Sequence, residues 1–312
     1  MQKIGILDVD SRMPNLALMK LSTYHKNRGD EVEGYLPILH RTYSKIYASK
    51  IFNFSDGSML TDDMIKGGSG IDVKTNLPEE IKNQKPDYSL YNFDHSLGFT
   101  QRGCRFKCGF CVVPKKEGSP YEENTIEEIW EHRKSKFIIL LDNDFFGNPS
   151  WDERVEEIKS FGLKVNFSQG LNIRIISEKQ ATALASINFT NLKNTFKQVT
   201  FAWDQIQDER VIERGFKRCV QAGIKPYRMQ FFVLIGYKTT PEEDMHRVRL
   251  LDSWGADPFV MAFDRSDPYQ KRFQRWVNHK ALFKTVEFQN YFKPTKKEQL
   301  EIDNSNQLEM FA

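Results

Sequence analysis

From residue 96 onwards the sequence alternates between short apolar runs and longer charged segments with helical spacing. The apolar runs are rich in aliphatic and aromatic residues, as expected for strands buried on both faces. This rhythm is typical of βα units that build a parallel sheet. The period alone leaves an open sheet and a barrel as alternatives. The six expected strands lie within residues 97–100, 136–142, 164–170, 197–204, 228–236 and 257–263.

Three of the four cysteines follow the first of these strands. Cys104, Cys108 and Cys111 have the spacing C-x3-C-x2-C within one expected loop. Thiolates suit iron–sulfur clusters and zinc, and three of them would bind three irons of a cubane and leave the fourth iron open. The alternatives are a zinc site completed by His95 or a distant ligand, and three unrelated buried thiols. The fourth cysteine, Cys219, lies in an expected helix and is interpreted as a core residue.

Candidate ligand-binding residues follow the later strands. In parallel α/β folds, ligands bind where the carboxyl ends of the strands meet. Loops are polar by default, so this pattern is less specific than the cysteine motif. The candidates after strands two to five are Asp142, Asn143, Asp144, Ser168, Gln169, Arg174, Asp204, Ile235 and Gly236.

The amino-terminal part has a different organisation. Residues 3–9 are an expected buried strand, and residues 15–28 are an expected helix that Gly29 ends. Further strands are expected near residues 31–37 and 45–54, before a segment rich in Gly, Pro and Asn that is typical of a linker. The expected parts are an amino-terminal domain at 1–85, a larger α/β domain at 86–264 and an extension at 265–312.

Bulk properties exclude several classes of protein. The chain has 312 residues, a net charge of +3 and 39% hydrophobic residues, as expected for a soluble globular protein. No apolar run approaches the roughly 20 residues of a membrane span, and the amino terminus lacks the pattern of a signal peptide. Few cysteines in a chain of this length indicate a reducing compartment, so we expect a cytoplasmic protein without a membrane partner.

The cysteine loop resembles that of the radical S-adenosylmethionine (SAM) superfamily. The motif C-x3-C-x-aromatic-C, here Cys104, Cys108, Phe110 and Cys111, follows the first strand of a six-fold βα series. The resemblance covers roughly residues 96–263 and implies a partial (β/α)6 barrel. It also implies a [4Fe-4S] cluster whose open iron binds SAM. One electron then cleaves SAM to methionine and a 5′-deoxyadenosyl radical, which abstracts hydrogen from a substrate.

The resemblance further implies which residues bind the methionine part of SAM. Family members contact its ammonium group after strand two, where Asp142–Asp144 stand in place of the usual Gly-Gly-Glu. Ser168 and Gln169 match polar positions after strand three. Arg174 follows them, and its planar guanidinium would suit the methionine carboxylate.

The nucleoside part of SAM is assigned to the next two strands in the same way. Asp204 ends strand four, where it would accept hydrogen bonds from the ribose hydroxyls. Ile235 and Gly236 end strand five, where they would pack against adenine.

Residues 1–85 resemble the Rossmann-like, cobalamin-binding type of domain that some radical SAM enzymes carry before the barrel. The cobalamin signature D-x-H-x-x-G would fall after the first strand. Here Asp10 stands where the cobalamin-ligating His would be, and Met13 replaces the Gly. We therefore expect a degenerate domain, with cobalamin unlikely as a cofactor.

The carboxyl-terminal extension combines basic and aromatic residues. Such a combination can bind nucleic acid, but Phe273, Trp276 and Phe283 fall at helical spacing, which favours a helix docked on the barrel. The resulting hypothesis is that this helix caps the barrel and that Arg272 and Arg275 reach an anionic part of the substrate beside Trp276.

Two classes of function remain open after these steps. The first is a radical SAM enzyme with an unknown small-molecule, peptide or RNA substrate, served by a reductant such as flavodoxin or ferredoxin. RNA modification and methyl transfer are alternatives within it, and methylthio transfer is disfavoured because the sequence lacks a second set of cysteines. The second class is a non-catalytic iron–sulfur or zinc protein.

Overall fold

The computed structural model describes residues 1–131 and 135–291. The chain divides into two compact units, Met1–Leu163 and the part that begins at Lys164. Parallel strands and helices make up both units, which confirms the α/β class. Closure into a partial barrel, and domain boundaries near residues 85 and 264, remain predictions. None of the helices within the described ranges combines the length and the apolar character that crossing a membrane requires.

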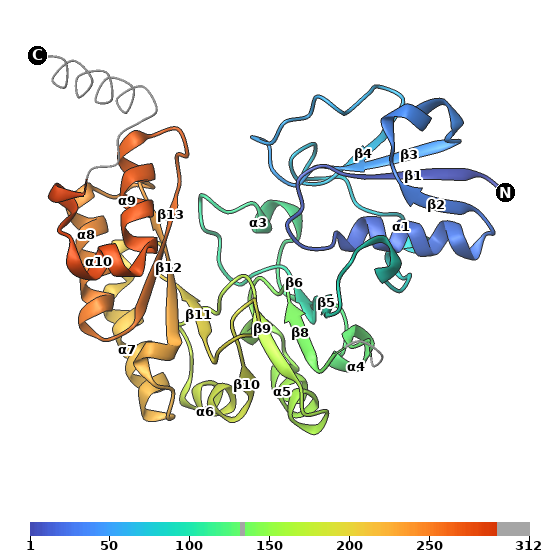
Figure 1. Ribbon diagram of the computed structural model, residues 1–312. Helices are drawn as coiled ribbons and strands as arrows, with labels where there is room; N and C mark the ends of the chain where they lie inside the picture. The colour runs from blue at the N-terminus through green and yellow to red at the C-terminus, as the bar shows by residue number, and fades with distance from the viewer. Residues whose placement is uncertain (132–134, 292–312) are drawn as a thin grey trace, which may run out of the picture. The chain divides into compact units, whose positions relative to one another are not determined.

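The first unit begins with a parallel sheet of four strands in the order β2-β1-β3-β4. The strands are β1 (Lys3–Asp8), β2 (Glu31–Gly34), β3 (Lys45–Ser49) and β4 (Ile65–Gly67). Helix α1 (Leu16–Asn27) lies along one face of this sheet (Figure 1), and Gly29 after it adopts φ +80°, as expected of a glycine that ends a helix. This order is that of doubly wound sheets, in which the connections reverse direction between β1 and β3.

An apolar cluster holds α1 against the sheet. It contains Ile4 and Ile6 of β1, Leu18 and Leu21 of α1, and Ile81 of the short helix α2 (Glu79–Lys82). Alternate residues of β1 and residues three apart on α1 point to the same side, so both elements contribute one apolar face. Short 3-10 segments at Pro37–Thr42 and Tyr88–Leu90 complete this part of the chain.

The rest of the first unit contains a parallel pair of strands, β5 (Ser96–Gly98) and β8 (Phe137–Leu140). Between them lie β6 (Gln101–Arg102), α3 (Val113–Lys116), β7 (Tyr121–Glu122) and α4 (Ile126–Ile129), with β6 and β7 paired antiparallel. After β8 come a 3-10 turn (Phe145–Gly147) and α5 (Trp151–Ser160).

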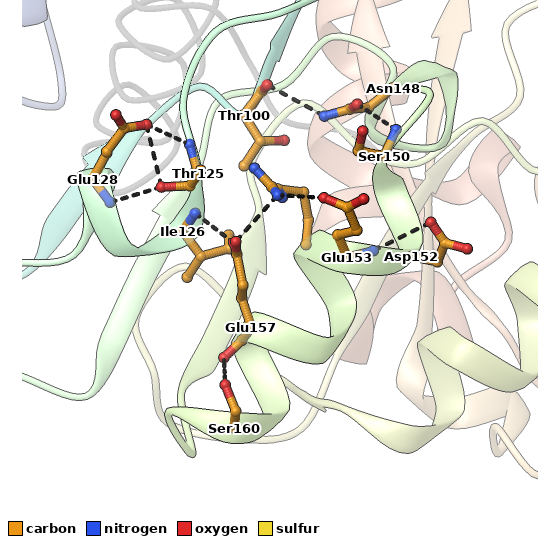
Figure 2. A network of polar contacts seen from close by, with 11 residues as sticks. Thr100, Thr125, Ile126, Glu128, Asn148, Ser150, Asp152, Glu153, Glu157 and Ser160 are labelled. Carbon is orange, nitrogen blue, oxygen red and sulfur yellow. Dashed lines mark hydrogen bonds and ion pairs between the residues drawn. The ribbon is translucent and has the colours of Figure 1, made fainter.

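One of the charged segments with helical spacing, residues 125–134, predicts a longer helix than α4 (Ile126–Ile129). Thr125 and Glu128 form a capping box at its start (Figure 2). It ends at Trp130, whose backbone is extended. The indole of Trp130 donates to the carbonyl of Ser135 at 2.8 Å. Residues 132–134 of the expected helix lie outside the described residues.

A polar network joins α4 and α5 (Figure 2). The Glu157 carboxylate accepts from the amide of Ile126 at 2.8 Å and pairs with the guanidinium of Arg154 at 3.1 Å. Asn148, just before α5, donates to the carbonyl of Thr100 at 3.3 Å. These bonds attach the backbone just after β5 to the start of α5.

The second unit continues the alternation of strands and helices. Strands β9 (Lys164–Phe167) and β10 (Asn188–Phe189) pair in parallel, as do β11 (Val199–Ala202), β12 (Met229–Ile235) and β13 (Asp257–Ala262). The helices are α6 (Glu178–Ser186), α7 (Glu209–Gln221), α8 (Pro241–Ser253), α9 (Pro268–Asn278) and α10 (Lys280–Thr285). Shorter 3-10 turns lie at Ile206–Asp208, Pro226–Arg228 and Phe288–Asn290. All expected strands of this unit are confirmed, and β10 is additional.

Candidate cluster and cofactor site

The three motif cysteines lie on the loop between β6 and α3. None of the three forms a disulfide within the described residues, and all three are half-buried. The loop closes at its base, where the amide of Cys104 donates to the carbonyl of Gly118 at 3.1 Å. Gly103 before it has φ +76°, and a side chain there would collide with the backbone of Ser119. The sequence RGCRFKCGFC therefore folds into one closed loop that carries all three sulfurs.

The thiols fit a cluster by their chemistry. Burial raises the pKa of Cys104 to about 11, so iron must displace a proton to bind it. Within the two described ranges, no three His, Cys, Asp or Glu side chains are gathered so that they could hold a metal ion. A cubane cluster does not need three ligands that converge on one ion, because each thiolate binds a separate iron. Three partly exposed thiols on one loop can therefore bind three irons of a cubane.

His95 does not join the cysteines. Its ring lies beside Phe137, with ring centroids 4.9 Å apart, and its Nδ1 lies 3.1 Å from the hydroxyl of Ser135. His95 precedes β5, whereas the cysteine loop follows it. The arrangement gives no support to a zinc site completed by His95. Cys219 is fully buried on α7, which confirms it as a core residue.

Asp142 accepts hydrogen bonds from other residues of the protein. It is buried, and its carboxylate accepts from the amide of Thr100 at 2.7 Å, from the Thr100 hydroxyl at 2.5 Å and from the amide of Gln101 at 3.3 Å. Burial raises its pKa to about 7, against the lowering effect of these bonds. Asp142 therefore holds the segment that leads from β5 into the cysteine loop.

The next two residues also bond to the cysteine loop. The Asp144 carboxylate accepts from Nε and Nη2 of Arg105 at 2.6 and 2.8 Å. The Asn143 amide donates to Glu117 at 2.7 Å. The expected contact to the methionine ammonium stays a prediction for all three residues. What the structure shows instead is a set of bonds to the loop that sequence reasoning missed, because their members are far apart in the chain.

In the second unit, Arg174 is already paired. Its guanidinium lies 3.0 Å from a carboxylate oxygen of Asp208, and its Nε donates to the side-chain oxygen of Asn172 at 3.3 Å. Of the two polar residues that precede it, Ser168 is half-buried and Gln169 is exposed. Arg174 would have to share its donors between Asp208 and a bound carboxylate.

The charge and burial of the Asp204 carboxylate suit a group that binds a ligand. Burial raises its pKa to about 6, although the guanidiniums of Arg174 and Arg247 favour the charged form. Each of these arginines is hydrogen bonded to another carboxylate, Asp208 and Asp244 respectively. Asp204 is therefore a half-buried acid, ionised at neutral pH, at the carboxyl end of β11.

A buried ion pair stands behind this strand end and was missed from the sequence. Arg247 and Asp244 are 0% and 1% exposed and lie 2.6 Å apart. Arg247 donates to the carbonyls of Trp203 and Leu234 at 2.9 and 2.8 Å, while Asp244 accepts from the amide of Gly236 at 3.3 Å. Arg247 and Asp244 are three residues apart on the inner face of α8, next to Val248. This spacing in the sequence could have indicated the ion pair.

The two residues assigned to adenine differ from each other. Ile235 is fully buried, so its side chain offers no surface to a ligand. Gly236 is half-buried with φ +76°, and a side chain there would collide with Gln270. The structure thus leaves Gly236 as the accessible member of this pair.

The carboxyl-terminal residues support docking. Arg272 donates to the carbonyls of Tyr291 and Phe288 at 2.6 and 2.9 Å, and Trp276 is fully buried with its indole bonded to the carbonyl of Val286. Arg272 and Trp276 thus fix the chain that follows α9. The hypothesis that Arg272 and Arg275 reach a substrate stays a prediction. Arg275 is exposed. The part of the extension from residue 292 onwards lies outside the described residues.

The residue that replaces the cobalamin-ligating His also has a local role. The Asp10 carboxylate accepts from the amides of Ile51 and Phe52 at 2.7 and 2.8 Å. It therefore joins the loops that follow β1 and β3, where doubly wound folds bind their ligands. Met13 is half-buried and packs against the core of the unit.

Comparison with known proteins gives two similarities. No family model matches the sequence. The chain is 28% identical over 110 residues to the ribosomal protein uS12 methylthiotransferase RimO of Prochlorococcus marinus (strain MIT 9312), a match that covers 31% of this chain and 24% of that relative. The aligned segment thus spans about a quarter of the relative.

A solved structure of apo, selenomethionine-labelled OxsB, a cobalamin-dependent S-adenosylmethionine radical enzyme, superposes with a TM-score of 0.36 and 14% identity. The superposition covers 84% of this chain and 49% of that chain. We draw nothing about fold or function from a likeness of this size.

RimO is a radical SAM methylthiotransferase. The sequence similarity to it agrees with the three-cysteine loop, which folds as one closed segment after β5. Together they support the resemblance of this chain to the radical S-adenosylmethionine superfamily.

Proposed function

We propose that this protein uses a [4Fe-4S] cluster to generate a 5′-deoxyadenosyl radical from SAM. The observation that carries the proposal is the closed loop with three half-buried thiols that form no disulfide, Cys104, Cys108 and Cys111. When bound, a reduced cubane with one open iron supplies the electron that splits a carbon–sulfur bond of SAM into methionine and the radical, which then takes a hydrogen atom from the substrate.

The protein's own residues would bind and orient SAM. In the second unit, Asp204 is the strongest candidate, because an ionised, half-buried carboxylate accepts strong hydrogen bonds from hydroxyl groups. Gly236 offers backbone at the end of the neighbouring strand. Arg174 is the candidate for the methionine carboxylate, with part of its donor capacity bound by Asp208.

The substrate is not carried over from the relative. The name of RimO concerns methylthio transfer to a ribosomal protein, and the shared segment covers too little of that enzyme to transfer its target. Outside the motif, this sequence has one cysteine, Cys219, which is buried in the core. We propose radical initiation, with an electron donor of the flavodoxin or ferredoxin type, as the activity of this chain.

Anaerobic reconstitution with iron and sulfide tests the proposal. The wild-type protein should bind about four irons per chain, as one cubane requires. Changing any motif cysteine to Ala should abolish this iron, whereas Cys219→Ala is the matched control and should retain it. Stoichiometric zinc in protein purified without oxygen, with no bound iron, would contradict the proposal.

A further inference from the structure

The loop after β8 bonds to three separate parts of the cysteine loop. Asp142 bonds to the segment before the cysteines, through Thr100 and Gln101. Asp144 bonds to Arg105, between the first and second cysteines. Asn143 bonds to Glu117, behind the last cysteine. Three consecutive side chains thus hold the beginning, the middle and the end of one loop.

The sheet places these residues beside the loop. Strands β5 and β8 pair in parallel, with Gly98 opposite Leu140 at their carboxyl ends. The chain leaves β5 toward the cysteines and leaves β8 toward residues 142–144 at the same edge. Side chains of the second segment can therefore reach the first without any long connection.

The bond between Asp144 and Arg105 is the most specific of the three. It is bidentate, and the same carboxylate also accepts from the amide of Arg105 at 3.3 Å. The Asp144 side chain is 1% exposed, and the guanidinium of Arg105 is its ion-pair partner. Loss of a charged hydrogen bond from a buried group is costly because the remaining group stays unsatisfied.

Gly147 makes room for this pair. A Cβ at position 147 would lie 2.5 Å from the nearer Asp144 oxygen and 3.0 Å from Nε of Arg105. The constraint is space alone, because the φ of Gly147 lies outside the left-handed region. Gly147 thus gives a way to displace the Asp144 carboxylate without changing any charge.

Glu117 closes the loop from its other end. Besides Asn143, its carboxylate accepts from the amide of Gly103 at 2.9 Å, and it pairs with Arg102 at 3.5 Å. Its side chain is 9% exposed. A carboxylate just after α3 thereby holds the two residues just before Cys104.

We propose that Asp142, Asn143 and Asp144 preorganise the cysteine loop for the cluster, with Asp144 and Arg105 as the central positioning pair. This inference rests on the proposed function. All three side chains of the segment are bonded to the loop, so they act on the position of the sulfurs. The cluster then assembles on a loop that these bonds have already ordered, so that cluster binding loses less conformational entropy.

Hydrogen exchange of the metal-free protein tests the inference without any activity. We compare wild type with Asp144→Asn, Gly147→Ala and the control Glu157→Gln. Glu157 is matched to Asp144, because it also pairs with an arginine and accepts from a backbone amide in the same unit. Exchange in residues 100–117 should accelerate about tenfold or more in the first two variants, since each loses charged hydrogen bonds that oppose local opening.

The control should accelerate exchange around Ile126 instead and leave the cysteine loop at its wild-type rate. Equal rates for the loop in wild type, Asp144→Asn and Gly147→Ala would overturn the inference. So would equal acceleration of the loop in Glu157→Gln, because the loop would then report general stability only.

Iron binding and a double variant distinguish an effect on the position of the cysteine loop from an effect on the stability of the whole protein. Asp144→Asn should bind less iron than Glu157→Gln on reconstitution, and the cluster that it retains should give a broadened electron paramagnetic resonance signal. Adding Arg105→Gln to Asp144→Asn should accelerate exchange no further, because the two side chains act as one unit. An additive effect would contradict the pairing. If wild type binds no iron, the proposed function fails, while the exchange rates still decide whether this loop is held as described.

Discussion

The two regions that carry the expected cofactor residues use their carboxylates in different ways. In the loop after β8, Asp144 is bidentately paired with Arg105 and holds protein to protein. At the end of β11, the cations near Asp204 are hydrogen bonded to other acids, and burial raises its pKa to about 6. An acidic residue after a strand can therefore either hold a neighbouring loop or be available to bind a ligand. The bonds that it already makes within the protein distinguish the two roles.

The largest effect should come from the buried pair behind the second region. Arg247→Met should lower the free energy of unfolding by about 3–5 kcal/mol, because Asp244 would be left as an uncompensated buried charge. Chemical denaturation of the metal-free protein measures this change. Arg275→Met, at an exposed position of α9, should change stability by less than about 0.5 kcal/mol. A similar loss in both variants would show that the pair at Arg247 has no special role.

The second prediction separates the two carboxylates by ligand binding. Asp204→Asn should weaken SAM binding about tenfold or more, since it removes a charged acceptor worth about 1.5–3 kcal/mol. Its iron content should stay at the wild-type level, in contrast to Asp144→Asn. Isothermal titration of the reconstituted protein gives the affinity. Unchanged affinity would remove Asp204 from the proposed site.

The pH dependence of SAM binding should report the same group. Asp204 is ionised above its pKa of about 6 and accepts hydrogen bonds best in that form. Affinity should therefore be full at pH 7 and fall as the pH drops through 6, by about tenfold for the first full unit below the pKa. The Asp204→Asn variant should lack this step. A step that persists in the variant would assign the titration to another group.

The smallest effect is expected at the amino-terminal sheet. Burial acts to raise the pKa of Asp10, but the amides of Ile51 and Phe52 outweigh it and the pKa is lowered. Its stabilisation is thus present above the ordinary Asp pKa and is lost as the pH falls below it. Asp10→Asn should cost about 0.5–1 kcal/mol at pH 7, because the site is partly exposed. Thermal unfolding at pH 7 and pH 3 measures it, and an equal cost at both would contradict the charge-based explanation.

Much of the fold could be predicted because local patterns carry it. The apolar runs at 136–142 and 228–236 became β8 and β12, since strands buried on both faces have few polar residues. The spacing of Phe273 and Trp276 correctly predicted a docked helix, and both are fully buried. The early end of α4 could not be predicted, because no glycine or proline marks the point where the backbone of Trp130 becomes extended.

The candidate site was less predictable away from the cysteines. The pairing of Arg105 with Asp144 spans 39 residues, and nothing in either local sequence indicates it. From the sequence, Gly147 looks like an ordinary turn residue, and its role becomes visible only from the position of the Asp144 carboxylate. Long-range polar bonds of this kind depend on which strands are adjacent, and the repeating period of the sequence does not contain that information.

One measurement tests the central claim most directly. The anaerobically reconstituted protein, reduced with dithionite, is incubated with SAM, and 5′-deoxyadenosine is quantified by mass spectrometry. We predict that wild type and Cys219→Ala form 5′-deoxyadenosine and methionine in equal amounts, whereas Cys104→Ala, Cys108→Ala and Cys111→Ala form neither. A wild-type protein that holds its full iron content and leaves SAM intact would contradict the assignment of this chain as a radical SAM enzyme.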